Sequence, residues 1–251
     1  MPAEESTAAI VLRARDYSES DRIVTLLTRE FGKLSGIAKG AKASRRRFER
    51  KLEPFSQVNL FFKRRPQGQL VFITRAEPGD SVPPPIEDDL AKIALGSYML
   101  ELADALTSEE AEAADAYHVL ARALAALGGA KATLAMRQSF ELNILRAAGF
   151  GLDFARCRIC GVAEPVTGGA VYFVVARGGI VCVRCRPQAP EGAVRLAVAN
   201  ASALAALAAS PIEHGTILAH AGGDGALAVA RFLASILDRK LRSVAFLDSL
   251  L

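Results

Sequence analysis

Two cysteine pairs constrain the fold of this chain more than any other feature of its sequence. Cys157 and Cys160 form one C-x-x-C pair, Cys182 and Cys185 form a second, and 21 residues lie between the pairs. Two such pairs can place four thiolates at the corners of a tetrahedron, which is the ligand set of a structural zinc ion. A site with four protein ligands is closed, so it leaves no open position for catalysis.

The residues between the pairs favour a zinc ribbon. Ala170–Val175 and Ile180–Val183 are apolar runs on either side of the glycine-containing turn at 177–179, which predicts a hairpin. We therefore expect one structural Zn²⁺ in an element spanning residues 155–187. Two disulfides or four free thiols are the alternative, although cysteines in a cytosolic chain more often bind metal than form structural disulfides.

The stretch Lys33–Arg65 is the most one-sidedly charged part of the chain. It holds eleven lysines and arginines and only two acids, Glu49 and Glu53. Like charges repel one another, so such a run indicates a polyanionic partner. Apolar residues threaded through it indicate a folded surface that presents cations. The alternative is a solvated face with a basic loop.

The first third of the chain carries a net charge of +6 over residues 1–80, against −2 over residues 81–251. The same part consists mainly of short runs in which apolar and polar residues alternate, separated by turns. This alternation predicts a small five-stranded barrel. The expected strands are Ala8–Arg15, Asp21–Thr28, Lys33–Ala38, Ser56–Phe62 and Gln69–Ala76. The one long connection, Gly40–Pro54, is packed with cations.

Helical periodicity replaces the alternating pattern after the prolines near residue 80. We expect a barrel domain at 1–79 and an otherwise all-α domain at 80–251 that carries the Cys₄ zinc ribbon, which makes the chain an α+β multidomain protein. The expected helices are Ile86–Leu106, Ser108–Leu127, Lys131–Ala148, Ala201–Ala209 and Gly225–Arg242, the last with Asp224 as its N-cap.

No catalytic constellation is visible in the sequence. Nucleotide-binding glycine motifs, a nucleophile elbow and a metalloprotease motif are missing, and His118, His214 and His220 lie in separate segments. We therefore expect no catalytic residues and no enzymatic activity. The acidic N-terminus does not fit a signal peptide, and no apolar run approaches the ~20 residues that span a bilayer, so we expect a soluble cytoplasmic protein.

Five motifs occur in order over nearly the whole chain: Asp16–Thr28 (DYSESDRIVTLLT), Glu30–Gly40 (EFGKLSGIAKG), Leu52–Ser56 (LEPFS), the two cysteine pairs and Leu237–Leu247 (LDRKLRSVAFL). Together they resemble the bacterial RecO family of recombination mediators. The resemblance implies an N-terminal OB-fold barrel, a helical domain and a zinc-binding element between helices. Some members of the family have incomplete cysteine pairs, whereas both pairs are intact here.

The resemblance also implies function. RecO-like proteins bind single- and double-stranded DNA, anneal complementary strands, act with RecR and in some bacteria with RecF, and engage single-strand-binding protein. They help to load RecA onto gapped DNA, so RecA is an indirect partner, and they work at the bacterial nucleoid. An RNA-binding OB protein and a zinc-ribbon enzyme that modifies nucleic acid are the alternatives.

Cations of the basic stretch are the candidate DNA-binding residues. The long connection supplies Lys39, Lys42, Arg45, Arg46, Arg47, Arg50 and Lys51, and the turn between the last two strands supplies Lys63, Arg64 and Arg65. Phe48 is expected either to stack on a base or to pack beneath the loop.

A partner's acidic, apolar tail, such as the C-terminus of single-strand-binding protein, needs cations beside an apolar groove. One candidate patch is Arg239, Lys240 and Arg242 beside Phe232, Leu237 and Phe246. Phe232, Ile236 and Arg239 are three or four residues apart, so they are expected to share one helical face. The other is Arg137 and Arg146 beside Phe140 and Leu145. In both patches the cations alternatively only complement the helix C-terminus. We expect RecR to bind the barrel side.

Overall fold

The structure of the chain is a computed structural model that describes residues 3–44, 47–48, 51–65, 70–79, 86, 89–109, 111–163 and 169–251. Contacts within it define two compact units, Met1–Gly129 with Ser243–Leu250, and Ala130–Arg242 with Leu251. The first unit contains the strands of the first third and the helices that pack beside them. The boundary at residue 79 that the sequence predicts marks the end of those strands and stays a prediction.

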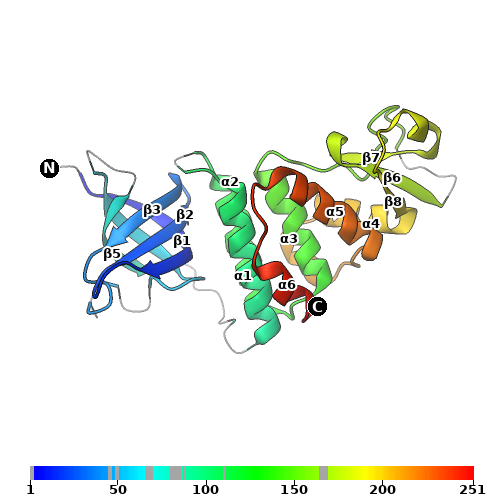
Figure 1. The fold of residues 1–251 in the computed structure, drawn as a ribbon. Helices are drawn as coiled ribbons and strands as arrows, with labels where there is room; N and C mark the ends of the chain where they lie inside the picture. Colours follow the sequence, from blue (N-terminus) through cyan, green and yellow to red (C-terminus); the bar gives the residue numbers. More distant parts are fainter. Residues whose placement is uncertain are drawn as a thin grey trace. The chain divides into compact units, whose positions relative to one another are not determined.

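Five strands in the first unit close into a barrel (Figure 1). They are β1 (Glu5–Asp16), β2 (Arg22–Thr28), β3 (Gly32–Ala38), β4 (Gln57–Lys63) and β5 (Val71–Pro78). The strand order is β1-β2-β3-β5-β4, β4 pairs back onto β1, and β3 with β5 is the parallel pair. Closure in this order matches the expected OB-like barrel, and each strand overlaps the run that predicted it.

The barrel interior follows from the alternating pattern of its strands. In β4, Val58, Leu60 and Phe62 are buried, and the residues between them are partly exposed. At Gly36 in β3, an added Cβ would lie 2.7 Å from a side-chain carbon of Ile73, so the close approach of β3 to β5 requires glycine.

Three helices complete the first unit: α1 (Leu90–Leu106), α2 (Ala114–Gly129) and the short α6 (Ser243–Asp248). The Asp89 carboxylate caps α1 by accepting hydrogen bonds from the backbone N–H groups of Ala91 and Lys92. The Glu101 carboxylate of α1 accepts from the backbone N–H of Ser243 at 2.9 Å and from its hydroxyl at 2.6 Å. These bonds fasten the start of α6 to α1.

The second expected helix begins six residues later than the sequence indicates, at Ala114 instead of Ser108. Before it, Glu109 forms an isolated bridge with Lys33 of β3, and its carboxylate accepts a hydrogen bond from the Ser35 hydroxyl at 2.9 Å. Tertiary contacts with the barrel therefore outweigh the local helix propensity of this segment.

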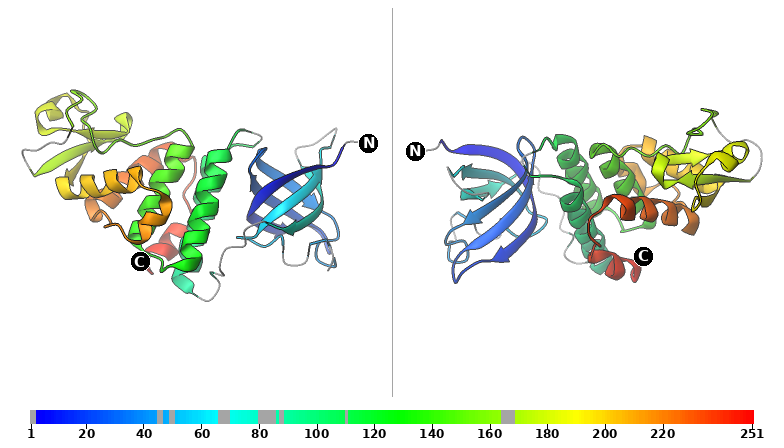
Figure 2. Two further views of the ribbon diagram at one scale, coloured as in Figure 1. Left: turned by 180° about the vertical axis from the view of Figure 1, so that it is seen from behind. Right: turned by 45° about the horizontal axis from the view of Figure 1, so that its top comes forward.

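The second unit combines helices α3 (Leu134–Ala147), α4 (Val198–Ala209) and α5 (Gly223–Ile236) with a small sheet (Figure 2). The strands β6 (Ala170–Val174), β7 (Gly179–Val181) and β8 (Val194–Ala197) pair in the order β7-β6-β8. Short 3₁₀ helices η1 (Val175–Arg177), η2 (Val183–Gln188) and η3 (Ile212–Thr216) connect these elements. The β6–β7 hairpin was predicted, whereas β8 was not.

Two expectations about α5 are wrong. The helix ends at Ile236 instead of continuing to Arg242, and Gly222 is its N-cap residue instead of Asp224. The Asp224 carboxylate lies in the first turn, where it accepts hydrogen bonds from the backbone N–H of Ala197 and from the Asn200 amide. The Asp224 carboxylate also accepts from the Gly225 N–H of its own first turn at 2.7 Å, so it links this turn of α5 to the start of α4.

Candidate nucleic-acid interface and metal centre

The connection between β3 and β4 is anchored to the barrel by its own apolar residues. Phe48 is only 3% exposed and packs in the barrel core together with Leu52. The backbone carbonyl of Arg47 accepts a hydrogen bond from the Ala76 N–H of β5 at 3.1 Å. The expectation that Phe48 stacks on a base is therefore wrong, and the alternative that it packs beneath the loop is correct.

The first part of this connection, residues 39–44, is tied to the turn between β1 and β2. Lys42 donates from its backbone N–H to the Ser20 carbonyl at 3.1 Å and from its ammonium group to the Ser18 carbonyl at 3.2 Å. The Lys42 ammonium also lies 2.9 Å from the Asp16 carboxylate. The Gly40 N–H donates to the carboxylate of Asp21 at 2.9 Å. We call this set of bonds between residues 16–21 and 39–42 the loop clamp.

Both carboxylates of the loop clamp are held in their ionised form. The hydrogen bond from Lys42 lowers the pKa of Asp16, and the hydrogen bond from the Gly40 N–H lowers the pKa of Asp21. The clamp therefore stays charged on its acidic side throughout the neutral range.

The described cations of the connection are accessible to a ligand to different degrees. Lys39, Lys42 and Arg47 are exposed and Lys51 is partly buried, while Arg45, Arg46 and Arg50 lie outside the described residues. The Arg47 guanidinium donates to the Lys39 carbonyl at 3.1 Å and lies 5.0 Å from the Phe48 ring centroid. These contacts bring Arg47 and Lys39 together at the clamped end of the barrel.

The three cations at the end of β4 differ from one another. The Arg64 guanidinium lies 3.2 Å from the Glu5 carboxylate and 5.5 Å from the Phe31 ring centroid, so internal contacts engage it. Lys63 pairs with Phe72 in the sheet and is partly buried, and Arg65 is exposed. The turn that follows lies mostly outside the described residues.

Part of the outer barrel surface is occupied by the chain itself. Lys33 and Ser35 alternate along β3 with core residues and contact Asp104 and Glu109. Arg13 of β1 also lies 3.7 Å from the Asp104 carboxylate. Both cations offset an internal acid; Lys33 is largely buried, whereas 62% of the Arg13 side chain stays exposed.

The sequence reasoning missed Tyr17, which is 64% exposed and lies directly after β1, in the 16–21 segment of the loop clamp. It also missed Asp16 and Asp21, whose carboxylates orient the basic connection. The turn sequence DYSESD contained the signal, because serine and aspartate side chains often bond the backbone of a tight turn.

The four cysteines converge as the sequence predicts. All four Sγ atoms lie within 4.8 Å of one another, and those of Cys160 and Cys182 are 3.9 Å apart. A tetrahedral site with metal–sulfur bonds of about 2.3 Å places its sulfurs about 3.8 Å apart. Cys157, Cys182 and Cys185 are buried, and Cys160 is exposed. The donor set therefore fits a four-coordinate metal ion.

The backbone around the first pair forms a tight knuckle. Gly161 adopts φ 72°, its N–H donates to the Cys157 carbonyl at 2.9 Å, and the Cys157 N–H donates to Val162 at 3.0 Å. The Cys182 N–H points at the Cys157 sulfur at 3.4 Å. Amide groups aimed at sulfur are typical of thiolate sites, where they offset negative charge.

The pKa values of two of the thiols are shifted in opposite directions. Burial opposes ionisation of Cys157, but backbone N–H groups at Cys160 and Cys182 outweigh it and lower the pKa of Cys157 to about 6. Burial and the neighbouring sulfurs raise the pKa of Cys185 to about 12. This cluster disfavours four thiolates without a cation, and a bound metal ion supplies one.

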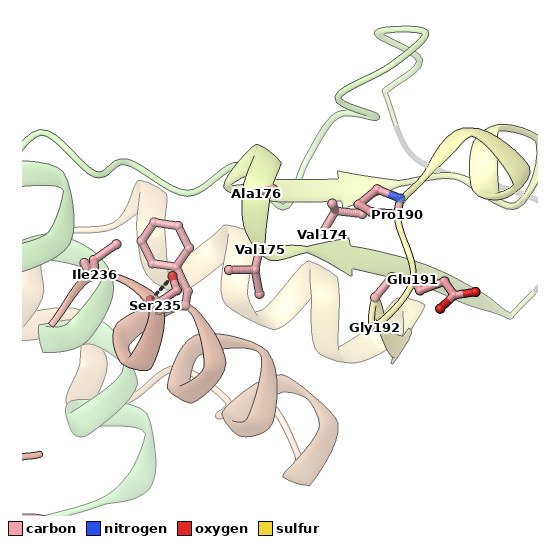
Figure 3. A pocket seen from close by; sticks show the side chains of 10 residues that line it. Val174, Val175, Ala176, Pro190, Glu191, Gly192, Ser235 and Ile236 are labelled. Atoms are coloured by element: carbon pink, nitrogen blue, oxygen red, sulfur yellow. Dashed lines mark hydrogen bonds between the residues drawn. The ribbon is translucent and has the colours of Figure 1, made fainter. Parts of the chain in front are cut away.

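A pocket of about 510 Å³ lies within the second unit. Figure 3 shows Val174, Val175 and Ala176 facing it from the end of β6 and from η1, with Ser235 and Ile236 of α5 opposite. Its remaining lining residues are Phe232 and the segment 190–193. The walls are mostly apolar, and Glu191 adds an acid.

The pocket includes one residue of the first candidate partner patch, Phe232. Phe232 and Ile236 line it, but α5 ends at Ile236, so the assumption that Arg239 continues their helical face is wrong. Arg239, Lys240 and Arg242 follow the helix end in sequence. Phe246 belongs to α6 in the other unit.

In the second candidate patch the aromatic and aliphatic side chains are buried and cannot contact a partner. Phe140 and Leu145 are fully buried in α3. Arg137 is 2.9 Å from the buried Glu141 carboxylate, and Arg146 donates to the Ala208 carbonyl at 2.6 Å. Both cations of this patch are engaged in internal contacts.

No helix in the described part of the chain is both long and apolar enough to cross a bilayer.

Comparison with known proteins gives matches over nearly the whole chain. The family model "Recombination protein O N terminal" matches residues 1–82, and "Recombination protein O C terminal" matches residues 87–244. A protein of Anaeromyxobacter sp. (strain Fw109-5) named DNA repair protein RecO is 39% identical over 246 residues, which cover 95% of this chain and 93% of the relative. Proteins of the same name from Myxococcus xanthus and Geobacter metallireducens are 37% and 36% identical, and the matches cover 95% and 97% of both chains, respectively. The chain belongs to the RecO family of DNA repair proteins.

Proposed function

We propose that the chain is a non-enzymatic recombination mediator that binds DNA and anneals complementary strands. The observation that carries this proposal is the basic connection between β3 and β4, which the loop clamp holds at one end of the barrel. Cations on an anchored loop bind phosphates at a smaller entropic cost than cations on a free chain. Neutralising two strands at once lets them approach without mutual repulsion.

Lys39, Lys42, Arg47 and Lys51 are the proposed phosphate-binding residues in the described part of the connection, and Arg45, Arg46 and Arg50 join them by sequence. Lys63 and Arg65 extend this surface along β4. Arg64 contributes less, because Glu5 already offsets its charge. Phosphate contacts position a nucleic acid and carry no sequence information, so we expect binding without base specificity.

The test is a titration of oligonucleotide binding against salt. Log affinity should fall linearly with log salt, with a slope of about −0.7 per neutralised phosphate on single strands. Replacing Lys39 and Lys42 together with alanine should make the slope shallower by about 1 to 2. Lys131→Ala is the matched control, because Lys131 is an exposed cation of the second unit.

Three outcomes would contradict this function. A flat salt dependence would exclude phosphate neutralisation, and a failure to accelerate strand annealing would exclude the mediator role. Stronger binding to RNA than to DNA of the same sequence would favour the RNA-binding alternative. Cleavage of labelled DNA in Mg²⁺ by the pure protein would favour an enzyme.

The cysteine cluster is proposed to hold one structural Zn²⁺ through Cys157, Cys160, Cys182 and Cys185. The short sulfur–sulfur distances and the closed four-ligand set support zinc. When bound, the ion ties the loop after α3 to the β6–β7 hairpin and takes no part in a chemical step.

For partners, we propose RecR on the barrel side and the acidic tail of single-strand-binding protein on the second unit, with RecA loading as the downstream result. The pocket beside α5 supports the first patch as the binding site for the tail. The pocket is open and mostly apolar, and the basic segment Arg239–Arg242 comes soon after α5 in the sequence. The buried Phe140 and Leu145 disfavour the second patch. These roles place the protein at DNA in the cytoplasm.

A further inference from the structure

One exposed aromatic residue remains unexplained at the basic end of the barrel. Across the described residues of the barrel, 3–79 with their gaps, Tyr17 is the sole large hydrophobic side chain that is exposed. Within the connection between β3 and β4, Phe48 is buried in the core and Phe55 is partly buried. Tyr17 is thus the most exposed aromatic ring near the described part of this connection.

The backbone holds Tyr17 in a fixed turn. Its N–H donates to the Asp21 carbonyl at 3.0 Å, and the Asp21 N–H donates to the Ser18 hydroxyl at 3.1 Å. The Asp21 carboxylate accepts from the Gly40 N–H across the loop clamp. These bonds fix the backbone at Tyr17, so stacking has to order only the side chain, which lowers its entropic cost.

One cation, Lys42, contacts both chain neighbours of Tyr17. The Lys42 ammonium contacts Asp16, the residue before Tyr17, at 2.9 Å, and the Ser18 carbonyl, the residue after it, at 3.2 Å. The aromatic ring and the proposed phosphate-binding loop therefore occur at one end of the barrel. An aromatic face next to cations is the usual composition of a site for single-stranded nucleic acid.

We propose that Tyr17 stacks on an unpaired nucleobase of a single strand whose phosphates contact Lys42 and its neighbours. This inference deepens the proposed function and rests on it. In a duplex the bases already stack on one another, so the ring gains nothing there. Stacking on Tyr17 thus favours a single strand over a duplex, a distinction that phosphate contacts alone do not make.

The first test compares Tyr17→Ala with Tyr17→Phe in the full-length chain. The probes are oligothymidylate, a duplex, and an abasic oligonucleotide of the same length, at one salt concentration. Tyr17→Ala should weaken binding to oligothymidylate about 5- to 100-fold, and Tyr17→Phe should retain most of it. Neither variant should change binding to the duplex or to the abasic strand.

A second test uses the absence of tryptophan from the sequence. Tyr17→Trp introduces a single indole, whose emission can be excited apart from that of the tyrosines. Stacking should quench this emission on addition of oligothymidylate but not on addition of the abasic strand.

The results separate this inference from the proposed function. Equal binding of wild type and Tyr17→Ala to oligothymidylate, with binding still weakened by Lys42→Ala, overturns the stacking inference alone. An equal loss on the abasic strand overturns it as well, because the role of Tyr17 is then not stacking. If the wild-type chain binds none of the probes, the proposed function fails and the inference fails with it.

Discussion

The Lys33 ammonium lies 3.2 Å from the Asp104 carboxylate and donates a hydrogen bond to the Asp104 backbone carbonyl at 2.7 Å. The Lys33 side chain is 14% exposed and that of Asp104 is 6% exposed. The first cation of the basic stretch is therefore used to join β3 to the C-terminal part of α1. The density of charge in the sequence does not distinguish Lys33 from the exposed lysines of the same stretch, Lys39 and Lys42.

Lys33→Met should destabilise the protein by about 3–5 kcal/mol, because it removes the cation that lies 3.2 Å from the buried Asp104 carboxylate. Urea unfolding measures the loss. Lys39→Met is the matched control, since Lys39 is exposed, and it should change stability by less than about 0.5 kcal/mol.

A double replacement, Lys33→Met with Asp104→Leu, should recover part of the stability that Lys33→Met loses. Removing both charges of a buried pair avoids the cost of leaving one of them unpaired. If the single and double variants unfold at the same urea concentration, the ion pair is not the source of the effect.

Asp16→Asn should raise affinity for DNA, by about two- to fivefold at low salt. The substitution removes the negative charge that partly offsets Lys42 at the exposed loop clamp. Glu191→Gln serves as a control, because it removes an acid from the second unit. An unchanged or lower affinity for Asp16→Asn would mean that the clamp geometry matters more than the charge it removes.

The sequence predicted the barrel and the cysteine cluster because both depend on local patterns. Alternation in β4 requires only that Val58, Leu60 and Phe62 face one side. The C-x-x-C spacing likewise fixes which sulfurs can meet. In both cases the contacts across the fold agree with the local signal.

The predictions failed where contacts distant in sequence decide the structure. Phe48 sits among charged residues that suggest a surface, yet it fills the barrel core. Glu109 suits a helix start, but Ser35 of the barrel engages it. The segment after Ile236 has good helix formers, yet Leu237 has extended dihedral angles. No pattern within one window of sequence contains this information.

Cys160→Ser should lower metal content and thermal stability while leaving DNA binding by the barrel largely intact. Metal analysis of the wild-type chain should give about one zinc per chain, and less than about 0.3 would contradict the structural site. Cys160 is the exposed ligand, so its replacement disturbs packing less than replacement of a buried cysteine. Loss of DNA binding together with zinc would show that the metal element contributes to the nucleic-acid interface.

Acid should release the metal. Zinc binds thiolates, and the Cys157 thiolate takes up a proton as the pH falls through its pKa of about 6. This pKa is below the usual value of 9.0, so the stability that Cys157 contributes without metal is present above about pH 9 and lost as the pH falls towards 6. Protons compete with zinc for all four sulfurs, so zinc retention after dialysis should fall as the pH is lowered, and retention that does not change with pH would contradict thiolate ligation.

The pocket beside α5 offers a test for the partner site. Ile236→Glu should weaken binding of a fluorescent acidic tail peptide at least about tenfold, because it places a like charge in the apolar wall. Ile236→Lys is the matched control: it removes the same apolar surface but attracts the peptide, so it should bind much more tightly than Ile236→Glu. Arg137→Ala, in the patch whose apolar residues are buried, should have little effect on peptide binding. If Arg137→Ala weakens peptide binding and Ile236→Glu does not, the peptide binds at α3 and the assignment to this pocket is wrong.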